Sequence, residues 1–144
     1  MPFYYYNTEV ASMSVPCEVA VKCVLPVVRA MIARELTDSY GLKQVDAAKL
    51  LRVSQPAISL YSRSIRGKAI DLADDGEIRR LVSHMTESLA KGPVPHRDLI
   101  LMYCAVCKAI RSKGLLCKLH KAFDPTVEIE KCELCIRDMS AQCT

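Results

Sequence analysis

The chain has 144 residues, of which 51% are hydrophobic and 25% charged, and its formal net charge is +4. This is the composition of an ordinary globular protein with one compact domain or two very small ones. No apolar run reaches the ~20 residues that a membrane-spanning helix needs, and the first seven residues lack the charge and apolar core of a signal peptide. We therefore expect a cytoplasmic protein without a membrane partner.

The pattern of apolar residues predicts an all-α fold, because they recur at helical spacing and no strand pattern is convincing. Residues 1–15 form an N-terminal extension without helical periodicity. A short helix is expected over 17–25 and a second over 26–40, because proline at Pro26 is tolerated only in a first turn or at a kink. Gly41 then supplies the left-handed residue that ends the second helix.

A helix-turn-helix is predicted next, over residues 42–66, inside a DNA-binding domain that spans 16–70. Small or apolar residues occupy the positions where two helices must pack together: Ala47, Ala48, Leu51, Val53, Ile58 and Tyr61. Ser54 stands where the second helix needs an N-cap, and Pro56 falls in its first turn, where a missing N–H costs nothing. These positions favour a helix-turn-helix over a helical hairpin with an incidentally polar face.

The second helix of this motif presents a polar row that predicts contact with double-stranded DNA. Gln55, Ser59 and Arg63 recur at a spacing of four, and Gln pairs with adenine and Arg with guanine in the major groove. Residues 41–70 hold six basic residues and one acidic residue, a net charge of +5, as expected for a surface that neutralises phosphates. The predicted DNA-binding residues are Ser54, Gln55, Pro56, Ser59, Ser62, Arg63, Arg66 and Lys68; of these, Ser54, Ser62, Arg66 and Lys68 suit phosphate contacts.

Two further amphipathic helices follow the motif. Over 74–91, Asp74 and Glu77 have the spacing of a capping box, and Gly92-Pro93 ends the helix. Its apolar face comprises Ile78, Leu81, Val82, Met85 and Leu89. This face suits a core, but a linker or dimerisation helix over 74–95 would look the same; a homodimer is expected because one reading helix covers few base pairs. The last predicted helix spans 97–113 and ends at Gly114.

Residues 96–144 form a region rich in cysteine, and the chain has eight cysteines in all. Two C-x-x-C pairs bracket a C-x-x-H pair, Cys117 with His120, a spacing typical of metal ligands rather than disulfides in a reducing compartment. The predicted ligands are Cys104, Cys107, Cys117, Cys132 and Cys135. His120 is the weaker candidate, since it could be a surface histidine. Cys17 and Cys23 fall on different helix faces, which favours packing for both.

Zinc and a 4Fe–4S cluster both suit these ligands. Zinc would take four of them, most simply Cys104, Cys107, Cys132 and Cys135. Two observations favour iron–sulfur: the first pair lies within a helix rather than in the tight turn of a zinc ribbon, and a cluster would give a DNA-binding protein something to sense. Purely structural zinc is the alternative.

The chain resembles the predicted archaeal transcriptional regulators with a Cro-type (Xre-like) helix-turn-helix in four segments: PCEVAVKCVLPVVRAMIARELTDSYGL, KQVDAAKLLRVSQPAISLYSRSIRG, CAVCKAIRSKGLLCKLH and CELC. The resemblance covers roughly residues 16–135. It implies a DNA-binding domain of four or five helices, dimeric and acting on promoters. The chain departs from the family at Arg52, where glycine is usual because the turn favours a positive φ.

These patterns predict a sequence-specific transcriptional regulator gated by an iron–sulfur cluster that senses redox state or iron. Three alternatives stay open: a regulator with structural zinc only, an antitoxin-like protein that binds DNA and a second protein, and a thiol enzyme that uses a C-x-x-C pair or Cys117 with His120. No Gly-rich phosphate loop, βαβ pattern or apolar pair of carboxylates supports an enzyme, so we expect none.

Overall fold

The computed structural model describes residues 13–64 and 67–137, and within these ranges the chain is helical without a strand. The all-α prediction is confirmed for this part of the chain, whereas the predictions made for residues 1–12, for Arg66 and for 138–144 lie outside it. No helix within the described ranges has both the length and the apolar character that crossing a membrane requires. The elements are α1 Pro16–Val19, the π-helix η1 Ala20–Val24, α2 Leu25–Asp38, α3 Gln44–Leu51, α4 Gln55–Ser62, α5 Gly76–Ala90, α6 His96–Ser112, α7 Cys117–Phe123, α8 Ile129–Cys132 and α9 Leu134–Arg137.

Residues 16–38 form one uninterrupted helical run, where the sequence predicted two helices divided at Pro26. A proline inside an α-helix lacks the N–H and its ring crowds the carbonyl four residues earlier, here that of Lys22. The wider π turn of η1 ends at Val24, directly before α2, and Pro26 occupies the first turn of α2. The π turn relieves this crowding, so the helix continues through the proline.

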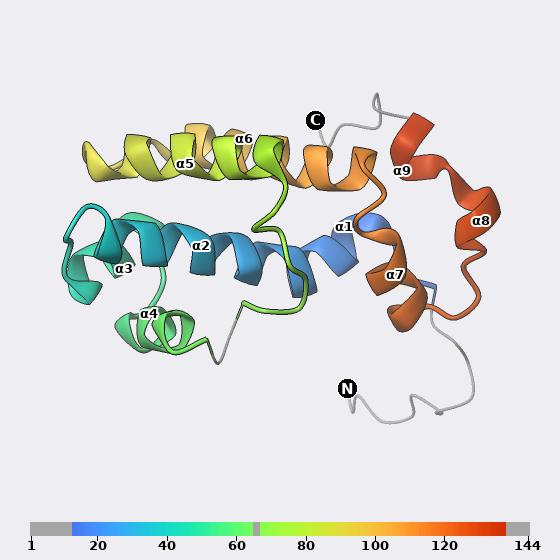
Figure 1. Ribbon diagram of the computed structural model, residues 1–144, viewed down its shortest axis with the longest axis horizontal. Helices are drawn as coiled ribbons and strands as arrows, with labels where there is room; N and C mark the ends of the chain where they lie inside the picture. The colour runs from blue at the N-terminus through green and yellow to red at the C-terminus, as the bar shows by residue number, and fades with distance from the viewer. Residues whose placement is uncertain (1–12, 65–66, 138–144) are drawn as a thin grey trace, which may run out of the picture.

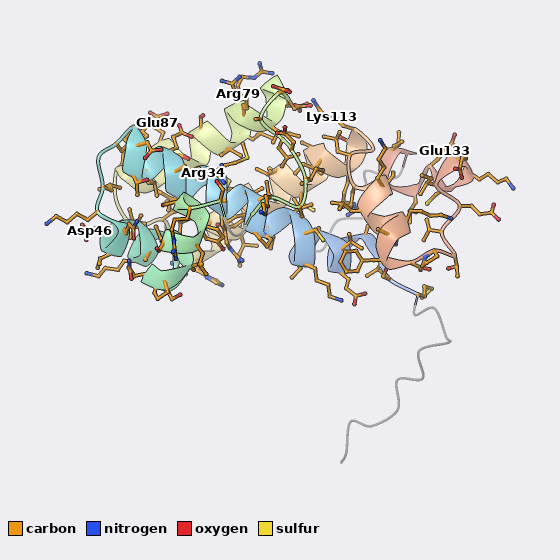
Figure 2. All side chains as sticks on the ribbon, turned by 60° about the horizontal axis from the view of Figure 1, so that its bottom comes forward. Arg34, Asp46, Arg79, Glu87, Lys113 and Glu133 are labelled. Atoms are coloured by element: carbon orange, nitrogen blue, oxygen red, sulfur yellow. The ribbon has the colours of Figure 1, made fainter. Side chains whose placement is uncertain are left out.

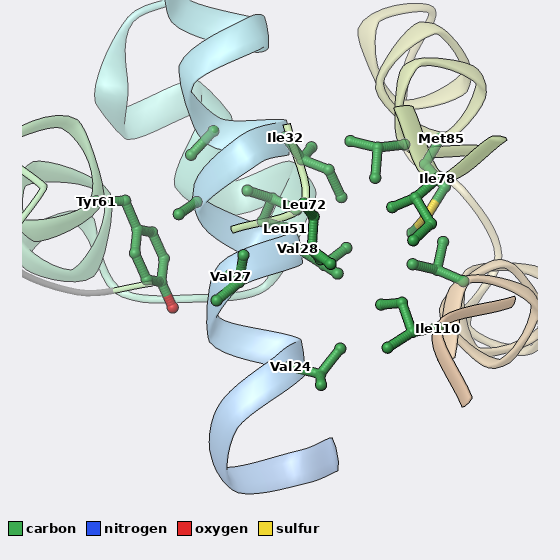
Figure 3. Close-up of a cluster of buried hydrophobic side chains, with 14 of the residues drawn as sticks. Val24, Val27, Val28, Ile32, Leu51, Tyr61, Leu72, Ile78, Met85 and Ile110 are labelled. Atoms are coloured by element: carbon green, nitrogen blue, oxygen red, sulfur yellow. The ribbon is translucent and has the colours of Figure 1, made fainter. Parts of the chain in front are cut away.

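Helix α2 is the centre of the fold (Figure 1). Helices α3 and α4 pack on one side of it and α5 on the other, and α6 packs on α5. Figure 3 shows the same division in side chains: Tyr61 of α4 lies on one side of α2, and Met85 of α5 and Ile110 of α6 on the other. One continuous cluster of buried side chains therefore runs from α1 to the residues just before α7.

The segment predicted to be a helix-turn-helix forms two helices, α3 and α4, separated by a short turn. Gly41 follows the C-terminal end of α2 in a left-handed conformation with φ +67°, and the Leu42 N–H donates to the Leu36 carbonyl at 3.0 Å. Ser54 caps α4, because its hydroxyl accepts the Ala57 N–H at 3.3 Å. The residues predicted to lie between the two helices are buried, except for Val53, which is partly buried: Ala47, Ala48, Leu51, Ile58 and Tyr61.

After α4 the chain returns across α2 to reach α5, and a glycine permits the close approach. A Cβ atom on Gly67 would lie 2.5 Å from the Ala30 Cβ and 2.6 Å from the Pro26 carbonyl oxygen. Gly67 also has φ +73°, which disfavours any other residue. This crossing fixes the segment that carries Lys68 against the helix that supports the motif.

The N-cap of α5 lies one residue later than predicted. Asp75, not Asp74, accepts the Ile78 N–H at 3.0 Å, so the predicted capping box of Asp74 and Glu77 is wrong. The apolar face of α5 packs on α2 and α6 within the same chain. The sequence left open whether this face forms core or a dimer interface; within the chain it packs in the core. Lys113, at the end of α6, forms ion pairs of 2.9 Å with both Asp75 and Glu77.

Candidate nucleic-acid interface and thiol cluster

The first turn of α4 presents the residues predicted to meet DNA. Ser54, Gln55 and Pro56 are exposed there, next to the exposed side of α3. Gln55 Nε2 donates to Gln44 Oε1 at 2.8 Å, so the two glutamines are joined across the motif. A glutamine held in this way loses less conformational freedom when it meets a base edge. The sequence pointed to Gln55 but not to its partner, because the pairing depends on how α3 and α4 cross.

The other predicted DNA-binding residues lie along α4 and just beyond it. Ser59 is partly buried and Ser62 is exposed. Arg63 is exposed, but it is the C-cap of α4 and not part of the helix, with φ −85° and ψ 5°.

Lys68 lies beside two cations that come from a distant part of the sequence. An open groove of about 560 Å³ is lined in part by Lys22, Arg29, Tyr61 and Lys68. Lys22 and Arg29 come from the helical run 16–38, far from the motif in sequence. A stretch of positive charge along one groove can bind a phosphate backbone without reading bases.

The turn between α3 and α4 carries a residue in the left-handed conformation. Arg52 has φ 57° and ψ 42°, a left-handed conformation that glycine adopts more readily than other residues. Its guanidinium Nη1 donates to His96 Nδ1 at 2.7 Å and its Nη2 to the Val94 carbonyl at 3.1 Å. The turn is thereby tied to the loop before α6 and to the first residue of α6, and the guanidinium is directed to protein groups.

The C-terminal region brings three of the predicted ligands to one cavity. The cavity measures about 230 Å³, and its lining includes Cys117, Cys132 and Cys135 together with His120. His120 is buried, so its interpretation as a surface histidine is wrong; its Nε2 is 2.7 Å from the Ser14 carbonyl oxygen. Burial raises the pKa of the Cys117 thiol, and the neighbouring Cys135 and Cys132 raise it further.

A second group of thiols surrounds Arg111 of α6. Its side chain donates to the Cys135 thiol, and Nη1 lies 3.8 Å from Cys17 Sγ. Burial raises the pKa of the Cys107 thiol; Arg111 opposes this shift, while Cys17, Cys104 and Cys135 reinforce it. Burial lowers the pKa of Arg111, but the bond to Cys135 and the nearby thiols raise it more, so the net shift is upward.

The predicted ligands thus converge without forming a finished metal site. Cys135, which is buried, interacts with both Cys107 and Cys117, whereas Cys104 and Cys132 are exposed. No three Cys, His, Asp or Glu side chains among the residues described here are spaced to hold one ion. The donors still suit zinc or an iron–sulfur cluster in kind, because thiolates are the ligands that both prefer and several of them share one cavity.

The sequence did not indicate that Cys17 and Arg111 would lie beside the C-terminal thiols. Cys17 stands nearly ninety residues before the first C-x-x-C pair, and Arg111 resembles any basic residue near a helix C-terminus. Cys23, the other early cysteine, is buried in the core as predicted.

Comparison of the chain with protein-family models, curated proteins and solved structures finds no match.

Proposed function

We propose that this chain is a sequence-specific DNA-binding transcriptional regulator of the cytoplasm, with no enzymatic activity of its own. The observation that carries the proposal is the exposed first turn of α4, in which Gln55 is oriented by Gln44 at 2.8 Å. α4 lies on a three-helix unit with α2 and α3, whose interior is filled by Ile58, Tyr61 and Leu51. In a DNA-binding unit of this kind, the second helix of the motif, here α4, presents its N-terminal residues to the major groove.

Phosphate contacts would come from residues on either side of this turn. Ser54 and Ser62 are exposed on α4 and its cap, and Lys68 shares a groove with Lys22 and Arg29. Phosphate contacts set the register of a protein on the duplex, and base contacts then specify the sequence. We therefore assign base contacts to Gln55, Ser59 and Arg63, and contacts with the DNA phosphate backbone to the groove that contains Lys68.

We propose a homodimer as the form that binds a promoter, since one helix reads too few base pairs to select a site. The apolar faces of residues 17–40 and 74–91 are used inside the chain. The apolar side chains left exposed on α6, Ile100 and Leu101, are the better candidates for the partner contact. Light scattering should report two chains per particle at micromolar concentration, and Ile100→Ser with Leu101→Ser should reduce this to one.

The C-terminal thiols would hold a 4Fe–4S cluster or, as the alternative, zinc. The half-buried or buried members of the predicted set, Cys107, Cys117 and Cys135, are its most enclosed ligands. A bound cluster would supply a redox-sensitive group, and zinc would supply stability alone. Iron and zinc content and the visible spectrum after anaerobic purification distinguish the two, and Cys107→Ser with Cys135→Ser should abolish uptake of either.

DNA recognition is tested by selecting duplexes from a random pool with the full-length chain and titrating the enriched sequence. Arg63→Ala should cost ~1–3 kcal/mol on that sequence and relax the preference at one base position. The matched control is Arg79→Ala, because Arg79 is exposed on α5, which packs on the side of α2 away from α4 (Figure 2). Equal losses in the two variants would contradict the assignment of the reading surface.

A further inference from the structure

The groove that contains Lys68 is formed by three separate segments of the chain. Lys22 and Arg29 come from the helical run 16–38, Lys68 from the crossing that follows α4, and Tyr61 from the last turn of α4 itself. Figure 3 shows the Tyr61 side chain reaching from α4 toward α2. The groove therefore adjoins the helix that is proposed to read DNA.

Arg29 is the most enclosed cation of this groove. It is half-buried, whereas Lys22 and Lys68 are exposed. Lys22 is paired with Glu18 at 3.1 Å, but no carboxylate in the described part of the chain lies within ion-pair distance of Arg29. A partly buried charge is costly unless a group of opposite sign accompanies it. An anion that enters the groove would therefore be stabilised by Arg29.

The Arg29 guanidinium lies over an aromatic ring from another helix. Its Cζ atom is 5.8 Å from the centre of the Tyr103 ring, and Tyr103 belongs to the middle of α6. A cation over the face of a ring is attracted by the ring electrons, and this contact limits the directions that the side chain can take. It leaves guanidinium N–H groups available for a phosphate, whereas a carboxylate partner would occupy them.

We propose that Arg29 contacts a DNA phosphate in this groove and that Tyr103 is its positioning residue. This inference rests on the DNA-binding function proposed above and extends it to a helix outside the helix-turn-helix. The same helix, α6, carries Cys104 and Cys107. A displacement of α6 that moves the Tyr103 ring would therefore change the affinity for DNA without altering the residues that read bases.

The phosphate role is tested by titrating full-length variants against the selected duplex and a random duplex of the same length, at several salt concentrations. Arg29→Gln removes the charge and keeps a planar polar end. It should weaken binding to both duplexes by about tenfold at about 0.1 M salt and reduce the slope of log affinity against log salt by about 1. Arg79→Gln, the matched control on the exposed side of α5, should leave both quantities unchanged. An Arg29→Gln variant with the affinity and slope of the parent overturns the proposal.

The positioning role of Tyr103 is tested by a double-mutant cycle. Tyr103→Leu removes the ring and should weaken binding to both duplexes by about two- to tenfold, whereas Tyr103→Phe keeps the ring and should bind like the parent. The effect of Tyr103→Leu should disappear in a chain that already carries Arg29→Gln, because the two residues then no longer interact. An equal loss in both backgrounds would show that Tyr103 acts independently of Arg29, and it would overturn the positioning role.

Tyr103 also packs against the core, so the fold of each variant is checked by circular dichroism. The cycle is repeated with Tyr103→Met, because methionine adapts its shape to the space that the ring leaves. The Arg29→Gln titration needs no change in the core, and it tests the phosphate contact whatever the Tyr103 variants do.

The outcomes separate this inference from the function on which it rests. A parent chain that binds no duplex removes the DNA-binding function and the role of Arg29 together. A parent chain that selects a duplex and loses affinity in Gln55→Ala, but binds unchanged in Arg29→Gln, retains the function and overturns the inference alone.

Discussion

Gln55 of α4 donates its side-chain N–H to the side-chain oxygen of Gln44 on α3, at 2.8 Å. The bond links the first residue of each helix of the motif, and both side chains border the surface proposed to meet DNA. The glutamine that would read a base is therefore oriented by a residue that need not contact one.

This bond predicts graded effects on DNA recognition. Gln55→Ala should cost ~1–3 kcal/mol on the enriched duplex and relax the preference at one base pair, because it removes the group that reads the base. Gln44→Ala should cost less and leave the order of preferred sequences unchanged, because Gln55 is then present but less constrained. Titrations and repeated selections measure both. A larger loss for Gln44→Ala than for Gln55→Ala would reverse the proposed roles.

The groove that contains Lys68 predicts a different response to substitution. Lys68→Ala should weaken binding to all duplexes about equally and reduce the slope of log affinity against log salt by about 1, because one phosphate contact is lost. Affinities measured between low and moderate salt on specific and random duplexes give this slope. Lys91→Ala is the control, since Lys91 is the exposed C-cap of α5, is paired with Glu87 and does not line this groove. A change confined to the specific duplex would contradict the phosphate role.

Substitutions of Arg52 can separate two contributions to stability: the strain of its left-handed backbone and the hydrogen bonds of its side chain. Replacement by Gly or by Ala removes the bonds to His96 and Val94 alike, but only Gly relieves the left-handed backbone. Arg52→Gly should therefore be more stable than Arg52→Ala by about 1 kcal/mol. Urea unfolding monitored by circular dichroism gives both free energies. An Ala variant as stable as the Gly variant would show that the turn has changed conformation.

The ion pairs of Lys113 predict how stability depends on pH. The Ile78 N–H and then Lys113 lower the pKa of Asp75, so its stabilising effect is present above its unfolded pKa of about 4 and is lost as pH falls through the lower folded value. Glu77 and then Asp75 raise the pKa of Lys113, so its effect is present below about pH 10 and is lost as pH rises through the higher folded value. Their shared contribution is thus complete between these limits.

Melting temperatures of the parent and Lys113→Ala should differ most, and by a constant amount, from about pH 5 to pH 9. The difference should shrink as pH falls from about 4 through the lowered pKa of folded Asp75, and as pH rises from about 10.5 through the raised pKa of folded Lys113. Lys91→Ala should show a smaller difference throughout, because its pair with Glu87 is more exposed. A difference that does not vary with pH would mean that Lys113 acts through packing instead of charge.

The sequence by itself determined the features that depend on neighbours along the chain. The helical periodicity, the cap at Ser54, the left-handed turn at Gly41 and the buried faces of α3 and α4 follow from propensities that act within a few residues. The boundaries of α5 and α6 were predicted to within two residues for the same reason. The cap at Asp75 was missed because Asp74 and Asp75 are equally good candidates until the helix axis is fixed.

Only the tertiary structure decided which distant residues meet. The π turn before Pro26, the bond between Gln44 and Gln55, and the burial of His120 against Ser14 each depend on packing between elements. Cys17 and Arg111 are separated by 94 positions, and no local pattern relates them. The spacing of the cysteines predicted thiol ligands, because pairs of donors close in sequence can be recognised without a structure. Which cysteines lie near one another depends instead on how α1, α6 and α9 pack together.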